Sequence, residues 1–325
     1  MRAVRDHGAL RLLTDAAQTR GAPPVRIDLE PLSERDGQTL LSNLLGVEGL
    51  PVSLRERILS RAEGNPFYIE EVIRSLIDQG VITHDEQGGE WRASSPQGSL
   101  PIPETLTGVL TARIDALPEE TRRVLQIAAV IGRIFPARVL AEITAGEAQL
   151  EPHLLALQHQ ELIRERTAGP QADYIFKHEL TREAAYNGLL LKERRQYHRR
   201  VAKAIERLYA DRSDELVELL ALHWQRAEEP LQATRYLMRA GERASHLGAS
   251  WQAIEHYEAA LRLVSTAGVS AGVPEHVIHE RLGDVYYEHL SRQEDALGHY
   301  REFLQSARGA EEAARRRASW PHCAC

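Results

Sequence analysis

Apolar residues recur along most of the chain at the spacing of helices that bury one face. Three such patterns occupy residues 33–80, and short stretches of glycine and proline separate them. The third pattern is predicted to bury Ile69, Val72, Ile73, Leu76 and Ile77. A period of three to four residues is typical of amphipathic helices that pack on a common core. We therefore predict a small helical domain, termed the lid domain, over residues 31–83.

Pairs of polar residues mark the expected starts of the first two helices. Ser33 with Asp36, and Ser53 with Glu56, have the spacing of a capping box, in which side chains bind the free N–H groups of a helix start. We expect a cap at both positions.

A tight turn precedes the third helix. Gly64 can adopt a positive φ that ends one helix, Asn65 can cap the next, and Pro66 has the fixed φ of a first helical position. The N–H groups and the positive dipole end of the new helix then face outward. Such a helix start suits contact with an anionic ligand such as a nucleotide.

The middle of the chain divides into a linker and a second domain. Residues 84–103 are rich in Gly, Ser, Pro and Gln, which predicts a linker. Helical patterns follow, and two short strand patterns then flank the Gly169-Pro170 turn. Helices that end in a β-hairpin predict a winged-helix domain over residues 104–190.

The last third of the chain carries a repeated pattern. Its members are Gly241, Ala253, Tyr257 and Ala260, and then Leu282, Gly283, Tyr286, Ala296 and Tyr300. Small residues let two antiparallel helices approach, and aromatic residues fill the space between units, as in tetratricopeptide repeats. The second copy has one extra residue before Ala296, and Trp224 with Tyr236 suggests a degenerate unit upstream. The alternative is ordinary pairing of amphipathic helices.

The two ends of the chain depart from these patterns. Residues 25–29 alternate like a β-strand, and one strand is not stable alone. We interpret residues 1–30 as the remnant of a truncated α/β nucleotide-binding domain. Repeats are predicted over residues 191–310, and residues 311–325 as an irregular tail. The expected fold class is mainly α, with a lid domain, a winged helix and an α-solenoid.

Composition excludes several classes of protein. The 325 residues carry a formal net charge of -7, whereas proteins dedicated to nucleic acid or membrane surfaces usually carry a basic excess. No apolar run has the length of a membrane span. The two cysteines, Cys323 and Cys325, exclude a disulfide framework, so we expect a cytoplasmic protein. His322 beside them does not make a metal site, and no metal is expected.

Four motifs in this order resemble one family. They are LEPLS at residues 29–33, GNPFYIEEV at 64–72, LPIP at 100–103 and YIFKHELTREAAY at 174–186. Together they resemble the C-terminal half of bacterial STAND-type ATPases, a branch of the AAA-related P-loop proteins. The resemblance is to the ATPase-plus-tetratricopeptide regions attached to adenylate or guanylate cyclase domains or to transcription regulators.

The resemblance implies a nucleotide-binding role for two parts of the chain. In that family the Gly-x-Pro turn of the lid lies against adenine, which makes Gly64, Asn65 and Pro66 candidate contacts. A histidine after the winged-helix strand senses the diphosphate, which makes His178 the candidate sensor. The alternative for His178 is local capping or packing.

The chain departs from the family at the phosphate site. It contains no Gly-Lys dipeptide and therefore no P-loop, and the acidic magnesium-binding strand is also missing. The resemblance implies ATP or ADP as the cofactor of the intact parent protein. We expect no enzymatic activity and no tight nucleotide binding by this chain alone, because the phosphates are not held.

A winged helix next to a basic run also raises the question of DNA binding. The run consists of Lys192, Arg194, Arg195, His198, Arg199, Arg200 and Lys203. The expected DNA-recognition helix over residues 150–160 contains no Lys or Arg, so we do not expect DNA as a partner. The preferred explanation of the run is a solvated face or salt bridges to neighbouring helices.

The leading functional hypothesis is a regulatory segment that couples nucleotide state to the binding of a protein partner or signal ligand by the repeats. It requires a P-loop domain in cis or in trans. One alternative is a tetratricopeptide scaffold without a nucleotide role, and another is a winged-helix transcription regulator. The signal, the effector domain, the oligomeric state and whether Met1 and the C-terminus are natural ends stay open.

Overall fold

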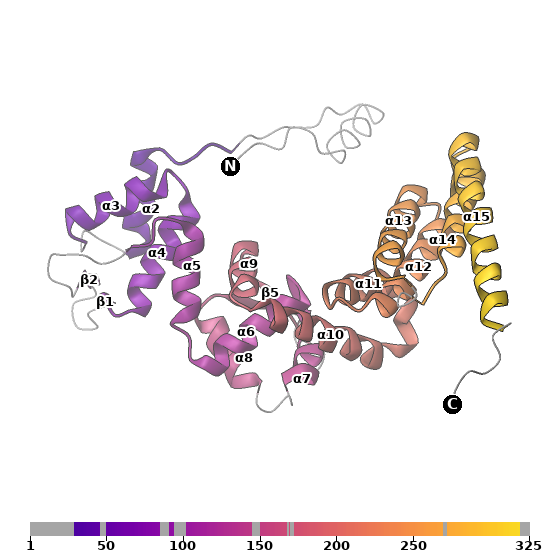
Figure 1. Cartoon of the computed structure of the whole chain (residues 1–325). Coiled ribbons are helices and arrows are strands. Elements are labelled where there is room, and N and C mark those ends of the chain that lie inside the picture. The colour runs from indigo at the N-terminus through magenta and orange to yellow at the C-terminus, as the bar shows by residue number, and fades with distance from the viewer. Residues whose placement is uncertain are drawn as a thin grey trace. The chain divides into compact units, whose positions relative to one another are not determined.

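The mainly helical chain divides into two compact units. The computed structural model describes residues 29–45, 50–84, 91–93, 102–144, 150–167, 169, 172–268 and 272–318. The units are Met1–Val109 and Leu110–Cys325 (Figure 1). The predicted fold class, mainly α with a small antiparallel sheet, is confirmed. The expected α/β remnant at residues 1–30 lies outside the described residues, except for residues 29 and 30.

Three helices build the core of the first unit. They are α2 (Glu34–Leu45), α3 (Val52–Ala62) and α4 (Pro66–Asp78). The predicted apolar face of α4 is confirmed, because Ile69, Val72, Ile73 and Leu76 are buried in one cluster and Ile77 packs against it in part. Ile58 of α3 is completely buried in the same cluster.

Only one of the two expected caps forms. The Asp36 N–H donates to Ser33 Oγ at 3.2 Å, and that hydroxyl donates to the Asp36 carboxylate at 2.6 Å. The Ser53 cap is wrong: the N-cap of α3 is Pro51, two residues earlier, and it has no side-chain cap. Pro51 has a φ of -53°, and its carbonyl accepts the N–H of Leu54 at 3.0 Å. The fixed proline ring favours this start.

Part of the expected linker belongs to the first domain. Strand β1 (Ile82–His84) pairs antiparallel with β2 (Trp91–Ala93), and the rings of His84 and Trp91 lie 4.9 Å apart. Ile102 is buried in the helical core, and Trp91 packs against it. A linker over all of residues 84–103 is therefore wrong for residues 91–93 and 102, because Trp91 and Ile102 gain more by packing than by facing water.

The second unit begins with the architecture of a winged helix. After α5 (Leu106–Asp115), which crosses the unit boundary, the order is α6 (Glu119–Ile131), β3 (Ile134–Pro136), α7 (Ala137–Thr144), α8 (Glu151–His159), β4 (Ile163–Thr167) and β5 (Asp173–Phe176). The predicted hairpin is β4–β5, and β3, which we did not predict, pairs antiparallel with β5. Phe135 and Phe176 are buried where the sheet meets the helices, with ring centroids 5.5 Å apart.

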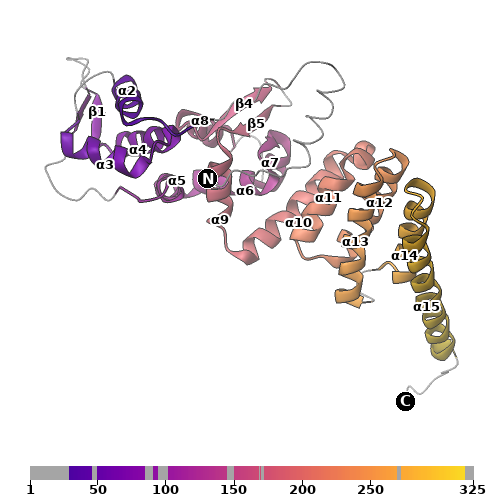
Figure 2. The ribbon, with the colours of Figure 1, turned by 90° about the horizontal axis from the view of Figure 1, so that it is seen from above.

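Helices continue from there to the end of the described chain. They are α9 (Glu179–Asn187), α10 (Leu191–Leu208), a 3₁₀ segment (Ala210–Leu216), α11 (Val217–Arg226), α12 (Pro230–His246), α13 (Ser250–Ala267), α14 (Glu275–Asp284), a π-helical turn (Val285–His289) and α15 (Gln293–Ala318). Short turns make consecutive helices antiparallel neighbours, and both views show α12 beside α13 and α14 beside α15 (Figure 2).

A glycine and a tyrosine join the two helices of each predicted repeat. A Cβ atom on Gly241 of α12 would lie 2.7 Å from Tyr257 Cδ1 of α13. A Cβ on Gly283 of α14 would likewise lie 2.6 Å from Tyr300 Cε1 of α15. The repeated pattern of small and aromatic residues therefore corresponds to a repeated contact, in which the ring occupies the space that a side chain would fill.

The extra residue of the second repeat coincides with the π-helical turn at Val285–His289, which follows Gly283 closely. A π-turn inserts one residue into a helix without ending it. The Gly283–Tyr300 contact is thereby kept although the sequence spacing is longer by one.

The last helix is longer than we expected. Helix α15 continues to Ala318, so an irregular tail over residues 311–325 is wrong for residues 311–318, and residues 319–325 lie outside the described chain. Alanine, glutamate and arginine, which dominate the sequence AEEAARRRA, are strong helix formers, and this propensity outweighs the loss of the repeat pattern. In the part of the chain that the structure describes, no helix is both long and apolar enough to cross a membrane.

The glycine–tyrosine contact can be tested by Gly241→Ala. We expect this change to lower the free energy of unfolding by about 1–3 kcal/mol, because the new methyl group overlaps the Tyr257 ring. The matched control is Gly298→Ala in α15, where an added Cβ would have nothing within 4 Å, and it is expected to stabilise by up to about 1 kcal/mol. Urea unfolding measures the free energy of unfolding of both variants. Equal changes in the two variants would refute the contact.

Candidate functional site

The turn between α3 and α4 has the geometry that its sequence predicts. Glu63 and Gly64 have φ values of 47° and 74°, in the left-handed region. Asn65 caps α4 by accepting the N–H of Phe67 at 3.1 Å, and Pro66 occupies the first turn. The α4 N-terminus therefore emerges directly from the turn, as we expected.

Besides its positive φ, Gly64 is required because the chain before α2 leaves no room for a side chain there. The Leu32 N–H donates to the Gly64 carbonyl at 2.8 Å, so the chain before α2 lies against the turn. A Cβ on Gly64 would lie 2.6 Å from the Leu32 carbonyl oxygen and 2.8 Å from Pro31 Cβ. Two of the four motifs on which the family resemblance rests, at residues 29–33 and 64–72, are thus in direct contact. The sequence alone did not show this contact.

A cleft of about 650 Å³ opens beside the turn, within the first unit. Gly64 forms part of its wall, and helices α2 and α3 form most of the rest. Leu59, Ile69 and Val52 supply apolar surface, whereas the charged side chains that line it are Glu34, Arg55 and Glu56. Ligand sites are usually such mainly apolar clefts with a few polar groups, and their usual volumes are roughly 300–1,000 Å³.

Arg55 is a functional candidate that the sequence did not reveal. Its Nη2 donates to the Leu50 carbonyl at 3.5 Å, whereas its buried Nε has no hydrogen-bond partner among the described residues. A buried donor without a partner is unfavourable, and a bound acceptor would relieve it. The only signal in the sequence was an arginine one residue before Glu56, which we had assigned to a cap.

The other residues of the predicted turn have different surroundings. Asn65 and Pro66 are exposed, and only Gly64 of the three lines the cleft. Tyr68 is buried and donates its hydroxyl to the Pro103 carbonyl at 2.6 Å. Burial raises the pKa of Tyr68, so the hydroxyl stays protonated as a donor. Tyr68 therefore ties the end of the predicted linker to α4.

His178 lies in the second unit, at the N-cap of α9, one residue after Lys177, which follows β5. Its φ and ψ of -130° and 142° are extended, and its side chain makes no capping hydrogen bond. Lys177 before it pairs with Glu161 at 2.5 Å, and Glu179 after it pairs with Arg182 at 2.6 Å. The expected position at a helix start is present, and the nucleotide contact at His178 stays a prediction.

The basic run on α10 is partly neutralised by acidic residues in the turn between α11 and α12. Arg195 pairs with Glu228 at 2.7 Å, and Arg199 pairs with Glu229. The preferred explanation of this run by salt bridges is confirmed for these two arginines. Exposed pairs of this kind contribute little to stability, but they reduce the positive field that a DNA backbone would need.

Two histidines of the second unit form a buried pair that we did not predict. The Nδ1 atoms of His198 on α10 and His223 on α11 lie 2.9 Å apart, and His198 Nε2 lies 3.0 Å from the Tyr186 hydroxyl. Burial, with the neighbouring His223, Arg226 and Arg194, lowers the pKa of His198 to about 3. Burial lowers the pKa of His223 to about 4. Both imidazoles are therefore neutral at pH 7.

Within the described residues, no group of three or more His, Cys, Asp or Glu side chains has the arrangement of a metal site. Cys323 and Cys325 lie outside these residues.

Comparison with known proteins gives a family match over part of the chain and distant structural similarities. Residues 33–89 match a domain family of unknown function, DUF8739, so this match covers the helices that form the cleft. No curated protein matches the chain significantly. The chain is structurally similar to a Signal Transduction ATPase with Numerous Domains (STAND) protein with a tetratricopeptide repeat sensor from Pyrococcus horikoshii, at 12% identity and a TM-score of 0.32.

That alignment covers 88% of this chain and 55% of the other. The chain therefore spans little more than half the length of that protein.

The contact between the turn and the segment before α2 can be tested by Gly64→Ala. We expect a loss of about 1–3 kcal/mol in unfolding free energy, because strain at positive φ adds to the overlap with Leu32. Gly80→Ala is the matched control: Gly80 has a φ of 68° but nothing within 4 Å of an added Cβ, so only strain remains. In urea unfolding, Gly64→Ala should have a clearly lower free energy of unfolding than this control. Equal free energies of unfolding in the two variants would contradict the contact.

The histidine pair predicts a pH dependence of stability. A histidine in the unfolded chain binds its proton near pH 6.5, whereas His198 and His223 do so only near 3 and 4 when folded. Between these values the unfolded state binds more protons, so the stabilisation present above about pH 6.5 is lost as the pH falls. From pH 7 to 5 we expect a loss of roughly 1–2 kcal/mol per histidine.

Urea unfolding at both pH values measures this loss, which should be smaller in His223→Gln. Exposed His246 provides the control, and His246→Gln should keep the full dependence. If the unfolding free energy changed equally with pH in the unmodified chain and in both variants, the pH dependence would not come from the histidine pair.

Proposed function

We propose that this chain is a non-catalytic regulatory segment of a STAND-type ATPase, which couples nucleotide state to partner binding by its helical repeats. The first unit would contact the adenine of ATP or ADP, and the winged helix would contact the phosphates through His178. A P-loop domain, in cis or in trans, would hold the phosphates and magnesium. Binding of a partner or signal to the repeats would release the nucleotide-dependent resting state.

The observation that carries this proposal is the Gly64 turn on the wall of the cleft of about 650 Å³. The apolar side chains of Leu59 and Ile69 are suited to a flat base, and Arg55 Nε is a donor without a hydrogen-bond partner among the described residues. These groups suit an adenine ring, which has flat apolar faces and ring nitrogens that accept hydrogen bonds.

The second support is the order of the four motifs, two of which meet at Leu32 and Gly64. His178 at the start of α9 is chemically suited to an anionic ligand, because an imidazole N–H can donate to a phosphate oxygen there. The antiparallel pairs α12–α13 and α14–α15 supply surface for a partner.

A scaffold without a nucleotide role is the second candidate, because the Gly241–Tyr257 and Gly283–Tyr300 contacts form a solenoid that needs no nucleotide. DNA binding has less support. The described α8 contains no Lys or Arg, and Arg195 and Arg199 of the basic run already have carboxylate partners.

The absence of catalysis is directly testable with the purified chain. We expect no magnesium-dependent ATP hydrolysis above background and no tight ADP binding, because residues 1–325 contain no P-loop lysine. Release of phosphate and equilibrium dialysis with ADP measure the two properties. Turnover that depends on magnesium would contradict the proposal.

The nucleotide role can be tested by adding a separately expressed P-loop domain from an ATPase with the same motif order. We expect the mixture to retain ADP, and Pro66→Gly or His178→Ala to weaken retention about tenfold, as for one lost contact to a charged or closely packed group. Retention of labelled ADP on a desalting column is the measurement.

Two matched variants control this experiment. Pro152 also occupies the first turn of a helix, and His159 is an exposed histidine of α8, so Pro152→Gly and His159→Ala should leave ADP retention unchanged. Retention that is insensitive to all four changes would contradict the nucleotide role and favour the scaffold.

A further inference from the structure

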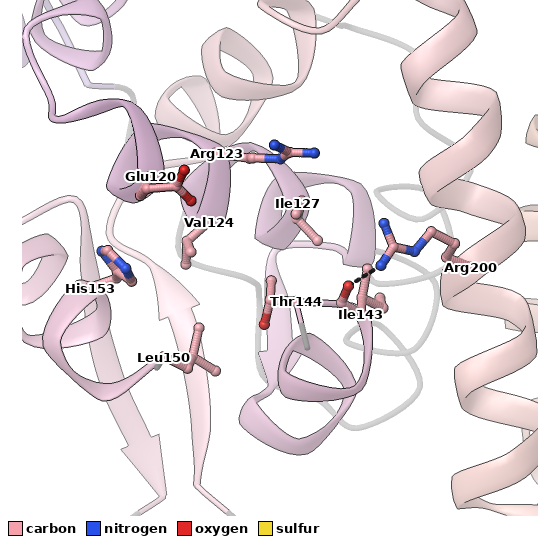
Figure 3. Close-up of a pocket in the computed structure, with 9 residues that line it drawn as sticks. All are labelled: Glu120, Arg123, Val124, Ile127, Ile143, Thr144, Leu150, His153 and Arg200. Carbon is pink, nitrogen blue, oxygen red and sulfur yellow. Dashed lines mark hydrogen bonds between the residues drawn. The ribbon is translucent and has the colours of Figure 1, made fainter. Parts of the chain in front are cut away.

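A second cavity, of about 210 Å³, lies in the second unit between α6, α7, α8 and α10. Figure 3 shows the side chains around it. The lining residues are Glu120, Arg123, Val124, Ile127, Ile143, Thr144, Leu150, His153 and Arg200. This cavity is separate from the cleft beside Gly64 and involves none of the residues of the proposed nucleotide site.

Two arginines line the cavity from different helices, and one tyrosine organises both. The Nε of Arg123 on α6 donates to the hydroxyl of buried Tyr197 at 3.3 Å. The guanidinium carbon of Arg200 lies 5.9 Å from the centre of the same tyrosine ring. Arg200 also donates through Nη2 to the Ile143 carbonyl. Both side chains are thereby held in place, while the two Nη groups of Arg123 make no hydrogen bond to described residues.

Neither of these two arginines forms an ion pair with a described residue, unlike their neighbours. The hydrogen bond to Tyr197 raises the pKa of Arg123, and the nearby charges of Glu120 and Glu193 add to this. Arg195, Arg199 and Arg207 of α10 form ion pairs with Glu228, Glu229 and Glu142 respectively. Within the described chain, neither Arg123 nor Arg200 has a carboxylate within ion-pair distance. Two fixed guanidinium groups without carboxylate partners favour a bound anion, above all a carboxylate that accepts several N–H groups.

A single acidic side chain lies on the same rim. Glu120 precedes Arg123 by about one helical turn on α6, so their Cβ atoms are roughly 5–6 Å apart. Glu120 forms no ion pair with another described residue. Its carboxylate lies on the side of His153 in Figure 3, away from the Arg200 side chain. His153 is itself held by Thr121, whose Oγ1 lies 2.9 Å from His153 Nδ1.

The floor of the cavity is apolar. Val124, Ile127, Ile143 and Leu150 are all buried and contribute aliphatic side chains. The volume of about 210 Å³ corresponds to roughly seven water molecules in the liquid, which limits a ligand to about that many non-hydrogen atoms or slightly more.

We propose that this cavity binds a free aliphatic α-amino acid. Its carboxylate would lie between Arg123 and Arg200, its ammonium group would face Glu120, and its side chain would contact the apolar floor. The positive and negative groups of the ligand are close together, as those of the rim are, and a leucine-sized side chain fits the volume. The site does not depend on the proposed nucleotide role, and α10 carries it directly to the first helices of the repeat region.

The proposal is tested by calorimetric titration of the full chain with L-leucine. We expect saturable binding with a dissociation constant below about 1 mM. Two truncated ligands measure how much each charged group of leucine contributes to binding. 4-Methylpentanoate lacks the ammonium group, and isopentylamine lacks the carboxylate. Both should bind at least about tenfold more weakly, because each leaves a charged group of the rim without its partner. No saturable heat up to about 10 mM L-leucine, or equal binding of 4-methylpentanoate, would overturn the proposal.

Substitutions connect the binding to the named residues. Arg123→Gln and Glu120→Gln should each weaken L-leucine binding about tenfold or more. Glu120 is exposed and makes no ion pair with a described residue, so this variant is expected to fold normally even if changes at Arg200 disturb α7. The matched control is Arg199→Gln, next to Arg200 on α10 but paired with Glu229 and outside the cavity, and it should bind within about twofold of the unmodified chain. Equal loss in the control would overturn the site.

Discussion

The structure depends on three places where a glycine lets other parts of the chain come closer than any side chain would allow. Gly64 lies against the backbone of Leu32, Gly241 against the ring of Tyr257, and Gly283 against the ring of Tyr300. The first contact shapes the wall of the cleft in the first unit. The other two set the distance between the helices of each repeat. Protein interiors are closely packed, so even one methyl group at such a position must displace its neighbour.

Helix α10 unites the winged helix and the repeats within the second unit. Arg207 pairs with Glu142 of α7, and Arg200 donates to the Ile143 carbonyl near the end of the same helix. On the side of the repeats, His198 contacts His223 of α11. A ligand that contacts Arg200 would therefore act on a helix that also packs against the first helices of the repeat region. This continuity connects the two parts physically through one helix.

Local chemistry explains why some expectations held and others failed. The turn from Glu63 to Pro66 and the Ser33 cap depend on neighbours within three residues, and both form as expected. The Ser53 cap had the same sequence pattern, but Pro51 started the helix earlier and left no free N–H group in the right place. Strand β3 was missed because three residues carry no clear period, and only pairing with β5 makes them a strand.

The sequence by itself determined the helical fold class, the glycine turn and the repeated small and aromatic positions, because these follow from backbone preferences and from periodicity over short distances. Tertiary structure alone decided which charges stay uncompensated. Arg199 and Arg200 are neighbours in sequence, yet one pairs with Glu229 while the other lines a cavity with Arg123. Successive helical residues point in different directions, so the environment of each depends on helices that lie far away in the sequence.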